Sequence, residues 1–211
     1  MKTVKFLFVL LFILSTPLQL FGRVTESAEN LLRIIHKVNR HWQENNSPQV
    51  RSFWDNAAYH TGNMEVYELT GNPPYLKYST DWAEYNHWKG AASDNKAEWK
   101  YGYGETPQYV LFGDWQCCFQ TYADLYGIRG DDRRIARARE VLEYQMGTDK
   151  NDYWWWADGL YMVMPVMTKL YRITKNPLYL EKLYEYFSYA DSVMYDPEAG
   201  LYYRDGSVVY P

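Results

Sequence analysis

The chain has 211 residues, a formal net charge of −4 and two cysteines, Cys117 and Cys118, that are adjacent in the sequence. A chain of this length can bury a sizeable hydrophobic core. Its acidic balance, without a stripe of Lys and Arg, argues against nucleic-acid binding, because phosphate contacts dominate that affinity. Neighbouring cysteines rarely meet disulfide geometry, so a disulfide scaffold is excluded as well.

Aromatic residues are unusually frequent, with 9 Trp and 22 Tyr in the chain. Buried Trp and Tyr need a partner for their polar tips, and flat rings with one polar edge suit the faces of sugars. Aromatic packing inside a helical bundle explains the same composition equally well. The composition alone leaves both interpretations open.

Residues 1–22 are typical of an export signal. Two lysines precede an unbroken apolar run from Phe6 to Leu14, which is too short to span a bilayer. We therefore expect a signal peptide that is removed, a mature domain covering residues 23–211, and a secreted or periplasmic protein. No membrane association is expected after cleavage.

The rest of the chain predicts helices. From Glu26 to Trp42, apolar residues recur at three- and four-residue steps, which indicates one apolar helix face. Further helices are expected at about 56–70, 75–88, 115–126, 131–146, 159–173 and 178–194, with a long loop over 89–113 and a short strand over 201–204.

An internal repeat indicates how these helices are connected. Residues 67–76 and 171–180 match at most positions, and residues 126–131 form a looser third copy. Each of the two close copies combines the end of one helix, a tight turn and a proline at the start of the next helix. Repeated helical hairpins predict antiparallel neighbours stacked side by side. About seven such helices favour an all-α toroid, and a straight helical solenoid is the alternative.

Three aspartates stand at the predicted starts of the second, fourth and sixth helices. They are Asp55, Asp114 and Asp158, and their aromatic neighbours are Trp54, Trp115, Trp155 and Trp156. If alternate helices form an inner row, these starts meet at one rim and the carboxylates gather in one aromatic-walled pocket. The structural alternative is that each Asp caps its helix, a role worth about 1 kcal/mol.

Four segments of the sequence carry a resemblance to a known family. They are YHTG at 59–62, DWQCCFQTYADLY at 114–126, WWWADGLYMVMP at 154–165 and DPEAGLYYRD at 196–205. In this order they resemble motifs of the unsaturated rhamnogalacturonyl hydrolases and their relatives, glycoside hydrolase families 105 and 88. The resemblance implies an (α/α)6 barrel of twelve helices, so we expect this chain to be the truncated N-terminal part of one.

The resemblance also implies an activity. Such enzymes remove the unsaturated (4-deoxy-4,5-ene) uronic acid from the non-reducing end of lyase-generated oligosaccharides, for example from pectin. An acid protonates C4 of the vinyl ether, water adds at C5, and the resulting hemiketal opens to release the rest of the sugar. By resemblance Asp158 is the acid/base and Asp114 its partner. The substrate-binding residues expected with them are Trp54, Asp55, Tyr59, His60, Trp115, Trp155, Trp156 and Met162.

The acid must hold a proton near neutral pH, although the reference pKa of Asp is about 3.9. The indoles of Trp154, Trp155 and Trp156 and a second carboxylate are expected to raise the pKa of Asp158, although the helix N-terminus has the opposite effect. A moderately acidic pH optimum of the activity is therefore expected. The uronate carboxylate also needs donors, preferably a planar Arg. Arg51 and Arg204 are candidates, and the sequence assigns the role to neither.

Other chemistries find little support in the sequence. The four histidines (His36, His41, His60 and His87) lack the spacing of a metal site, no phosphate loop is present, and neither a metal nor a cofactor is implied. One alternative is a sugar epimerase on the same barrel, which would use His pairs as acid and base. The other is a non-catalytic glycan-binding protein or an inactive remnant of the enzyme.

Overall fold

The computed structural model describes residues 27–207 and divides the chain into two compact units, residues 1–47 and 48–211. In the first unit, residues 27–45 form a helix. The predicted signal peptide, residues 1–22, lies outside the described residues. Among the described residues, no helix combines the length and apolarity that crossing a membrane requires.

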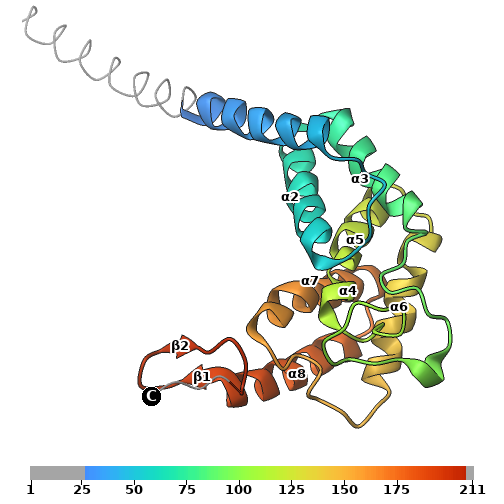
Figure 1. Cartoon of the computed structure of the whole chain (residues 1–211), viewed down its shortest axis with the longest axis vertical. Helices are drawn as coiled ribbons and strands as arrows, with labels where there is room; N and C mark the ends of the chain where they lie inside the picture. The colour runs from blue at the N-terminus through green and yellow to red at the C-terminus, as the bar shows by residue number, and fades with distance from the viewer. Residues whose placement is uncertain (1–26, 208–211) are drawn as a thin grey trace, which may run out of the picture. The chain divides into compact units, whose positions relative to one another are not determined.

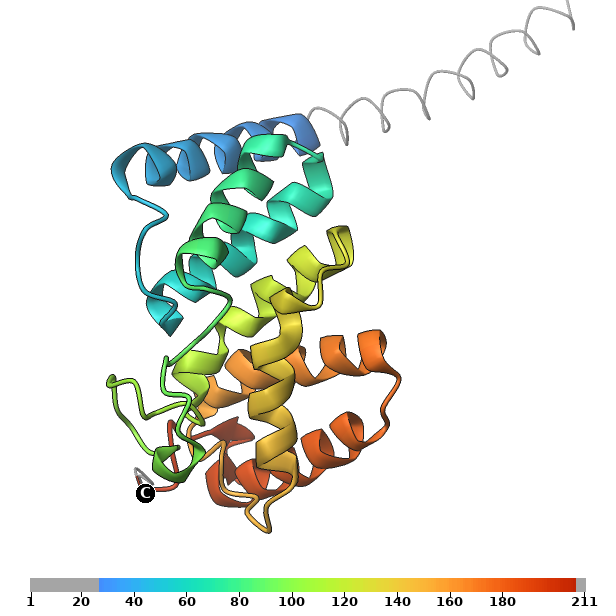
Figure 2. The same cartoon turned by 90° about the vertical axis from the view of Figure 1, so that its right-hand side faces the viewer.

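The second unit is built from helical hairpins, which Figures 1 and 2 show from two sides. Helix α2 contacts α5 and α5 contacts α7, so these three form an inner row, and each packs against its own partner: α3, α6 or α8. This arrangement confirms the predicted all-α hairpin fold, which is the arrangement of an α/α barrel. The helices are α2 (Trp54–Thr70), α3 (Pro73–Tyr85), α4 (Gly113–Gln116), α5 (Cys118–Ile128), α6 (Arg133–Met146), α7 (Ala157–Thr174) and α8 (Leu178–Met194).

A small β-hairpin follows α8. Strand β1 (Tyr195–Asp196) pairs antiparallel with β2 (Leu201–Tyr202), and Gly200 takes a left-handed φ of 67° in the turn between them. The chain then returns to the start of α7, where the backbone N–H of Ala157 donates to the carbonyl of Arg204 at 2.7 Å. The predicted strand over 201–204 is therefore shorter than expected, but it lies at the expected place.

The repeated turn has the same geometry in both close copies. Helix α2 ends at Gly71, which has a φ of 66°, and the N–H of Gly71 donates to the carbonyl of Tyr67 at 2.7 Å. Helix α7 ends at Lys175, which has a φ of 60°, and the N–H of Lys175 donates to the carbonyl of Tyr171 at 2.8 Å. Both helices thus close with a left-handed residue that satisfies a terminal carbonyl. The looser third copy lacks this cap, because Arg129 after α5 has an extended φ of −140°.

Two predicted helices differ from the observed ones in their end or their division, whereas the others from α2 to α8 agree to within two residues at each end. The helix expected to reach Trp88 ends at Tyr85, because His87 and Trp88 both adopt left-handed φ angles of 52° and 57°. Packing of the buried Trp88 ring against Tyr122 draws the chain out of the helix there. The helix expected over 115–126 begins earlier, at Gly113, and is divided at Cys117 into α4 and α5.

A proline inside α7 is compensated by a glutamine from α5. Pro165 has no N–H to donate to the carbonyl of Tyr161, four residues earlier. The side-chain amide of the buried Gln120 donates to that carbonyl at 2.9 Å and to the carbonyl of Met162 at 3.1 Å. Two residues from separate sequence motifs therefore form one structural unit that joins two inner helices.

The long loop between α3 and α4 is held by a buried arginine. Arg137 of α6 donates to the carbonyls of Ala91 and Ser93, and its guanidinium lies 4.9 Å from the centre of the Trp99 ring. The short 3-10 helix η1 (Lys96–Glu98) lies within this loop. Further along, the loop carries Tyr103, which reaches the pocket described below.

Core packing accounts for a large part of the aromatic composition. Several of the largest fully buried side chains are Trp or Tyr: Trp82, Trp154, Tyr122, Tyr153, Tyr179 and Tyr186. The aromatic residues that remain for a binding role are those that line a cavity.

Candidate active site

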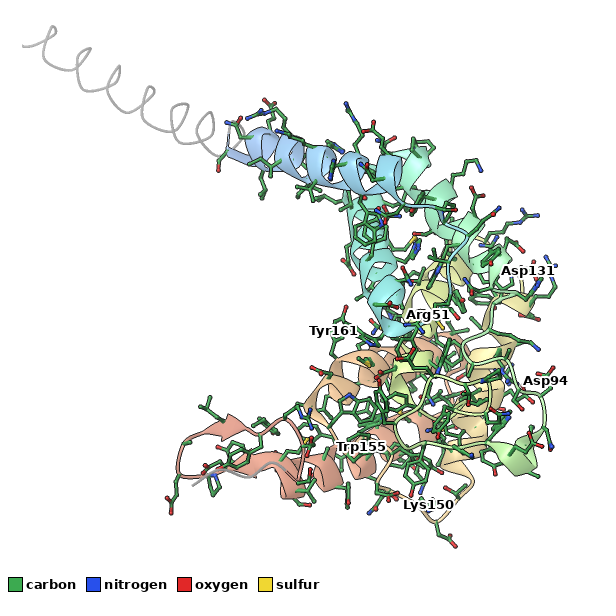
Figure 3. All side chains as sticks on the ribbon, in the orientation of Figure 1. Arg51, Asp94, Asp131, Lys150, Trp155 and Tyr161 are labelled. Carbon is green, nitrogen blue, oxygen red and sulfur yellow. The ribbon has the colours of Figure 1, made fainter. Side chains whose placement is uncertain are left out.

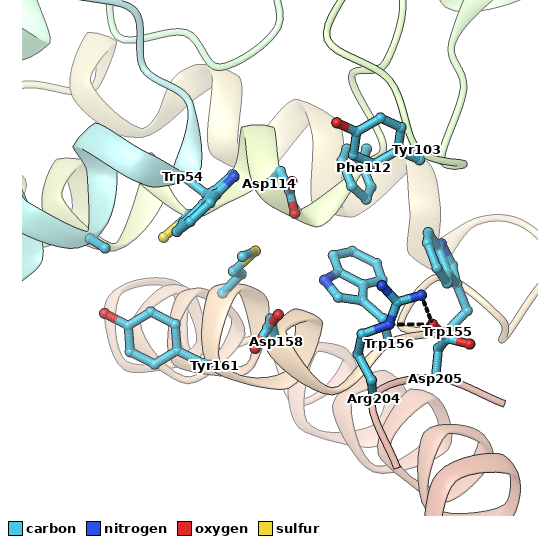
Figure 4. A pocket seen from close by; sticks show the side chains of 13 residues that line it. Trp54, Tyr103, Phe112, Asp114, Trp155, Trp156, Asp158, Tyr161, Arg204 and Asp205 are labelled. Atoms are coloured by element: carbon cyan, nitrogen blue, oxygen red, sulfur yellow. Dashed lines mark hydrogen bonds and ion pairs between the residues drawn. The ribbon is translucent and has the colours of Figure 1, made fainter. Parts of the chain in front are cut away.

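A pocket of about 720 Å³ opens where α2, α7 and α4, the short helix that leads into α5, begin (Figure 4). This volume is within the range of small-ligand sites. Loop residues and the segment after β2 complete its wall. The pocket is lined by Trp54, Ala58, Tyr103, Phe112, Asp114, Cys117, Trp155, Trp156, Asp158, Tyr161, Met162, Arg204 and Asp205.

Helices α2, α4 and α7 begin in the same way. Each has an extended aromatic residue at its N-cap (Phe53, Phe112 and Trp156), and each carries its aspartate at the second helical position. None of the three N-cap residues makes a side-chain capping hydrogen bond, and each aspartate lies inside its helix, not at the N-cap. The hypothesis that Asp55, Asp114 and Asp158 serve as N-caps is therefore wrong for all three.

Asp114 and Asp158 share the pocket, and Figure 4 shows their side chains on α4 and α7 at facing parts of its wall. Asp114 is 6% exposed, and its buried Oδ1 has no hydrogen-bond partner among the described residues. Burial, followed by the charges of Asp158, Glu105 and Asp55, raises the pKa of Asp114 to about 7. The raised pKa that a protonated carboxyl requires is thus found at Asp114.

Aromatic rings form one wall beside this pair of carboxyls. The ring centre of Trp156 lies 4.8 Å from Phe112 and 4.8 Å from Trp155. Glycines on two helices leave room for the Trp156 indole: a Cβ on Gly113 would lie 2.9 Å from it, and one on Gly159 would lie 3.3 Å from it. Only glycine at position 113 allows α4 and this ring to approach so closely.

Trp54 and Tyr161 stand at a more open part of the pocket. Both side chains are exposed, in contrast to the buried Trp156. Figure 3 shows Tyr161 on α7 and Trp155 just before that helix. Exposed aromatic faces of this kind suit stacking on a sugar ring.

Two of the residues predicted to bind substrate lie elsewhere because they bind protein groups. Asp55 is exposed and forms an ion pair with Arg51 at 3.5 Å, outside the pocket lining. Trp115 packs its ring 4.7 Å from that of Phe53 and donates its indole N–H to the carbonyl of Gly104 at 3.1 Å. Trp115 therefore fixes the loop over the helix start and does not line the pocket.

Tyr59 and His60 also lie outside the pocket lining. The imidazole of His60 is buried, stacks 3.9 Å from the Trp82 ring, and has its Nδ1 3.0 Å from the hydroxyl of Ser79. Burial lowers the pKa of His60 to about 3, so the ring is neutral. Tyr59 packs edge-on against His60 and Tyr78.

Sequence reasoning overlooked several lining residues. Cys117 stands three positions after Asp114, Tyr161 three after Asp158, and Ala58 four after Trp54. Residues three or four apart share a helix face, so this spacing could have identified them. Tyr103 comes from an irregular loop, and no periodic signal points to it.

The cysteines and the remaining acids suggest no metal centre. Within residues 27–207, no group of three or more His, Cys, Asp or Glu side chains is placed to hold a metal ion. Burial raises the pKa of Cys117 to about 12, so its thiol stays protonated beside Asp114.

Comparison with known proteins places these features in a family. The model of Glycosyl Hydrolase Family 88 matches residues 28–211. Among curated proteins, an unsaturated 3S-rhamnoglycuronyl hydrolase from Formosa agariphila is 25% identical over 165 residues, which cover 74% of this chain and 41% of that protein.

Two solved structures are more similar. A glycosyl hydrolase family 88 protein from Bacteroides vulgatus has 69% identity and a TM-score of 0.86, over 87% of this chain and 53% of that one. A polysaccharide lyase has 71% identity and a TM-score of 0.86, over 88% of this chain and 52% of that one. The chain spans about half the length of each of these two solved chains. Since the family match covers nearly all of the chain, the protein belongs to glycosyl hydrolase family 88.

Proposed function

We propose that the protein hydrolyses an unsaturated uronic acid from the non-reducing end of an oligosaccharide. The observation that carries this proposal is the pair Asp114 and Asp158 in one aromatic-walled pocket, with the pKa of Asp114 raised to about 7. Membership of family 88 and similarity to an unsaturated rhamnoglycuronyl hydrolase support it. Family membership also argues against the sugar epimerase alternative.

The proposed reaction consumes the double bond of the substrate. A carboxyl proton is delivered to C4, and the positive charge that develops at C5 is shared with the ring oxygen. Water adds at C5 and gives up a proton to the carboxylate, which restores the acid. The hemiketal then opens by breaking its C5–O5 bond, and C1 releases the rest of the oligosaccharide.

Asp158 is the proposed proton donor, and Asp114 is its partner. The raised pKa of Asp114 keeps a proton in the same pocket as Asp158 around neutral pH. The buried Oδ1 of Asp114 has no protein donor within the described residues, so a sugar hydroxyl or the attacking water is a natural partner. Trp54 and Tyr161 provide exposed ring faces for the sugar.

A second candidate activity is β-elimination, and it is favoured by the 71% identity to a polysaccharide lyase. In that reaction a base removes the C5 proton of a saturated uronide, the C4–O4 bond breaks, and the leaving oxygen takes up a proton from an acid. The reaction therefore creates the same C4–C5 double bond that the hydrolase consumes. Both reactions require a uronic acid in the pocket.

The ultraviolet absorbance of the conjugated double bond separates the two activities. The full chain is incubated first with an unsaturated disaccharide and then with a saturated uronide that carries a sugar at O4. Falling absorbance with the first substrate supports the hydrolase, whereas rising absorbance with the second identifies a lyase. An Asp158→Asn variant with undiminished turnover contradicts the proposed role of Asp158, because loss of a proton donor costs about 10²- to 10⁴-fold.

We also propose that the protein is exported. The support is the two lysines followed by the apolar run from Phe6 to Leu14. N-terminal sequencing of protein isolated from cells tests this: a mature chain beginning near residue 23 is expected, and an intact Met1 in the whole population contradicts it.

A further inference from the structure

The pocket contains a single cationic side chain among its lining residues, as far as the described part of the chain shows. Arg204 is the only Lys, Arg or His in that lining, and it stands among the carboxyls of Asp114, Asp158 and Asp205. A uronic acid brings one more negative charge into this surrounding. An anionic ligand in such a pocket needs a cationic donor, and a planar guanidinium matches a carboxylate with two parallel hydrogen bonds.

The backbone places Arg204 on the pocket wall. The chain after β2 forms an isolated β-bridge between Trp156 and Asp205, and the carbonyl of Arg204 accepts the N–H of Ala157 at 2.7 Å. These contacts fix residue 204 beside the first turn of α7, which carries Asp158. The position of the arginine is therefore coupled to that of the proposed proton donor.

Asp205 holds the guanidinium from one side. Its Oδ2 accepts from Nε of Arg204 at 2.8 Å and lies 2.6 Å from Nη2, while its Oδ1 accepts the N–H of Ser207 at 2.9 Å. Asp205 is 2% exposed, whereas the Arg204 side chain is 73% exposed. A guanidinium carries five N–H donors, so the two contacts with Asp205 orient it and leave donors for a ligand.

The other arginine near the inner helix starts is already committed. Arg51 pairs with Glu105 at 2.5 Å and with Asp55 at 3.5 Å, and it lies outside the pocket lining. Figure 3 shows it on the segment before α2. It is the matched control for Arg204, because its removal deletes the same charge close to the pocket without touching the lining.

We infer that Arg204 binds the carboxylate of the substrate's uronic acid and that Asp205 is the positioning residue that holds it. The inference rests on the proposed function in one respect, namely that the ligand is a uronide. It is independent of the direction of the chemistry, since the hydrolase and the lyase both bind this carboxylate.

The test is a binding measurement that needs no turnover. Calorimetry compares the unsaturated disaccharide as free acid and as methyl ester, using the full chain with Asp158→Asn so that neither ligand is consumed. Adding Arg204→Met is expected to weaken binding of the acid by roughly 10- to 100-fold, the range for charge-assisted hydrogen bonds, and that of the ester by less than about threefold. Arg204→Lys keeps the charge but loses the planar pair, so an intermediate loss is expected.

Two further variants identify the cause. Arg51→Met, the charge-matched control, is expected to change the acid affinity by less than about threefold, since screening weakens distant charges. Asp205→Asn leaves Arg204 in place but weakens the contact that orients its guanidinium. The variant is therefore expected to lower the preference for acid over ester while leaving binding of the ester unchanged. A purely structural role of Asp205 would weaken both ligands equally.

Several outcomes overturn the inference: equal weakening of acid and ester by Arg204→Met, no preference for the acid in the parent protein, or no measurable binding of the acid. Failure of the proposed function has a different signature. If the chain with Asp158 intact turns over neither substrate, but Arg204 still determines the preference for the acid, the uronate site stands and the proposed reaction is wrong.

Discussion

At the scale of single residues, the feature with the largest chemical consequence is the buried carboxyl of Asp114. It lies among three other acids, Asp158, Glu105 and Asp55, and it has a raised pKa, with burial as the main cause. Burying a carboxyl in this way lowers the stability of the folded protein near neutral pH and makes the group reactive. The same residue therefore links activity to the pH dependence of folding.

Replacement of Asp114 by asparagine is expected to stabilise the fold above neutral pH. The pKa of Asp114 is about 7 in the folded chain against 3.8 for the reference carboxyl, so the folded state holds its proton more tightly. Wild-type stability therefore falls as the pH rises from about 4 to about 7 and then stays level with respect to this group. The amide side chain of the Asp114→Asn variant does not titrate, so it carries no such penalty.

Thermal unfolding of both proteins at pH 4, 6 and 8 measures the effect. The Tm values are expected to be similar at pH 4, with the variant higher by a few °C at pH 8, since about 1 kcal/mol corresponds to roughly 2–4 °C for a domain of this size. A constant difference at all three pH values would mean that folding does not raise the pKa of this carboxyl.

At the scale of elements, the helix ends and helix–helix contacts follow local rules that sequence patterns reveal. The two matched turns begin with left-handed residues, Gly71 after α2 and Lys175 after α7. Glycine adopts this conformation without a Cβ penalty, whereas lysine does not. The repeat thus allows glycine and lysine to be compared at the same structural position.

Lys175→Gly is expected to stabilise the protein by about 0.5–1 kcal/mol, and Gly71→Ala to destabilise it by about 1 kcal/mol. Urea unfolding of the two variants at one pH gives both numbers. The comparison is matched, because each cap residue donates its N–H to the tyrosine four positions earlier. Destabilisation by the Lys175 variant would contradict the left-handed conformation at that turn.

The contact between Gln120 and the carbonyl left free by Pro165 predicts coupled stabilities. Gln120→Leu leaves the part-buried carbonyl of Tyr161 without a donor, which is expected to cost about 1–3 kcal/mol. Pro165→Ala supplies a backbone N–H for the same carbonyl. In that background the Gln120→Leu cost is expected to fall by about 1 kcal/mol.

The measurement is a double-mutant cycle in urea with the wild type, the two single variants and the double variant. Additive losses would show that the glutamine and the proline act independently. The pair would then be two unrelated features of the motifs that contain them.

At the scale of the whole molecule, the pocket exists because the starts of separate helices converge. Trp156 before α7 fits against Gly113 of α4, and Asp114 and Asp158 follow these two residues closely in the sequence. The geometry of the site therefore depends on how closely α4 and α7 approach, which no single helix determines.

Gly113→Ala tests this dependence. The added Cβ would lie 2.9 Å from the Trp156 ring and 3.2 Å from Val163, so the ring or the helix must move. Turnover is expected to fall by roughly 10- to 100-fold, the scale of loss from a misplaced site. Gly62→Ala in α2, where nothing lies within 4 Å of the new Cβ, is the control and is expected to retain activity.

Much of the helical framework was predictable from the sequence, because apolar periodicity and turn residues are local signals. The range 178–194 agrees with α8, and the repeated turns share the geometry that their matching residues predicted. The end of α3 was not predictable: Trp88 adopts a left-handed φ while its ring packs on Tyr122, which is distant in sequence.

The site was predictable only in part. Asp114 and Asp158 share a pocket as expected. His60 is also a polar residue within a motif, but it lies outside the pocket lining and is buried against Trp82. Tyr103 reaches the pocket from a loop that Arg137 holds from another helix. Residue type and motif position could not separate these cases, because burial and loop position depend on contacts between segments far apart in the chain.

The sequence by itself determined the helices, their hairpin order and the acidic residues at the inner helix starts, since spacing along one chain encodes all three. Tertiary structure alone decided which carboxyl has the raised pKa and which arginine faces the pocket. Desolvation and charge–charge interactions act through space, so Asp114 and Arg204 acquire their properties from neighbours that the linear order does not reveal.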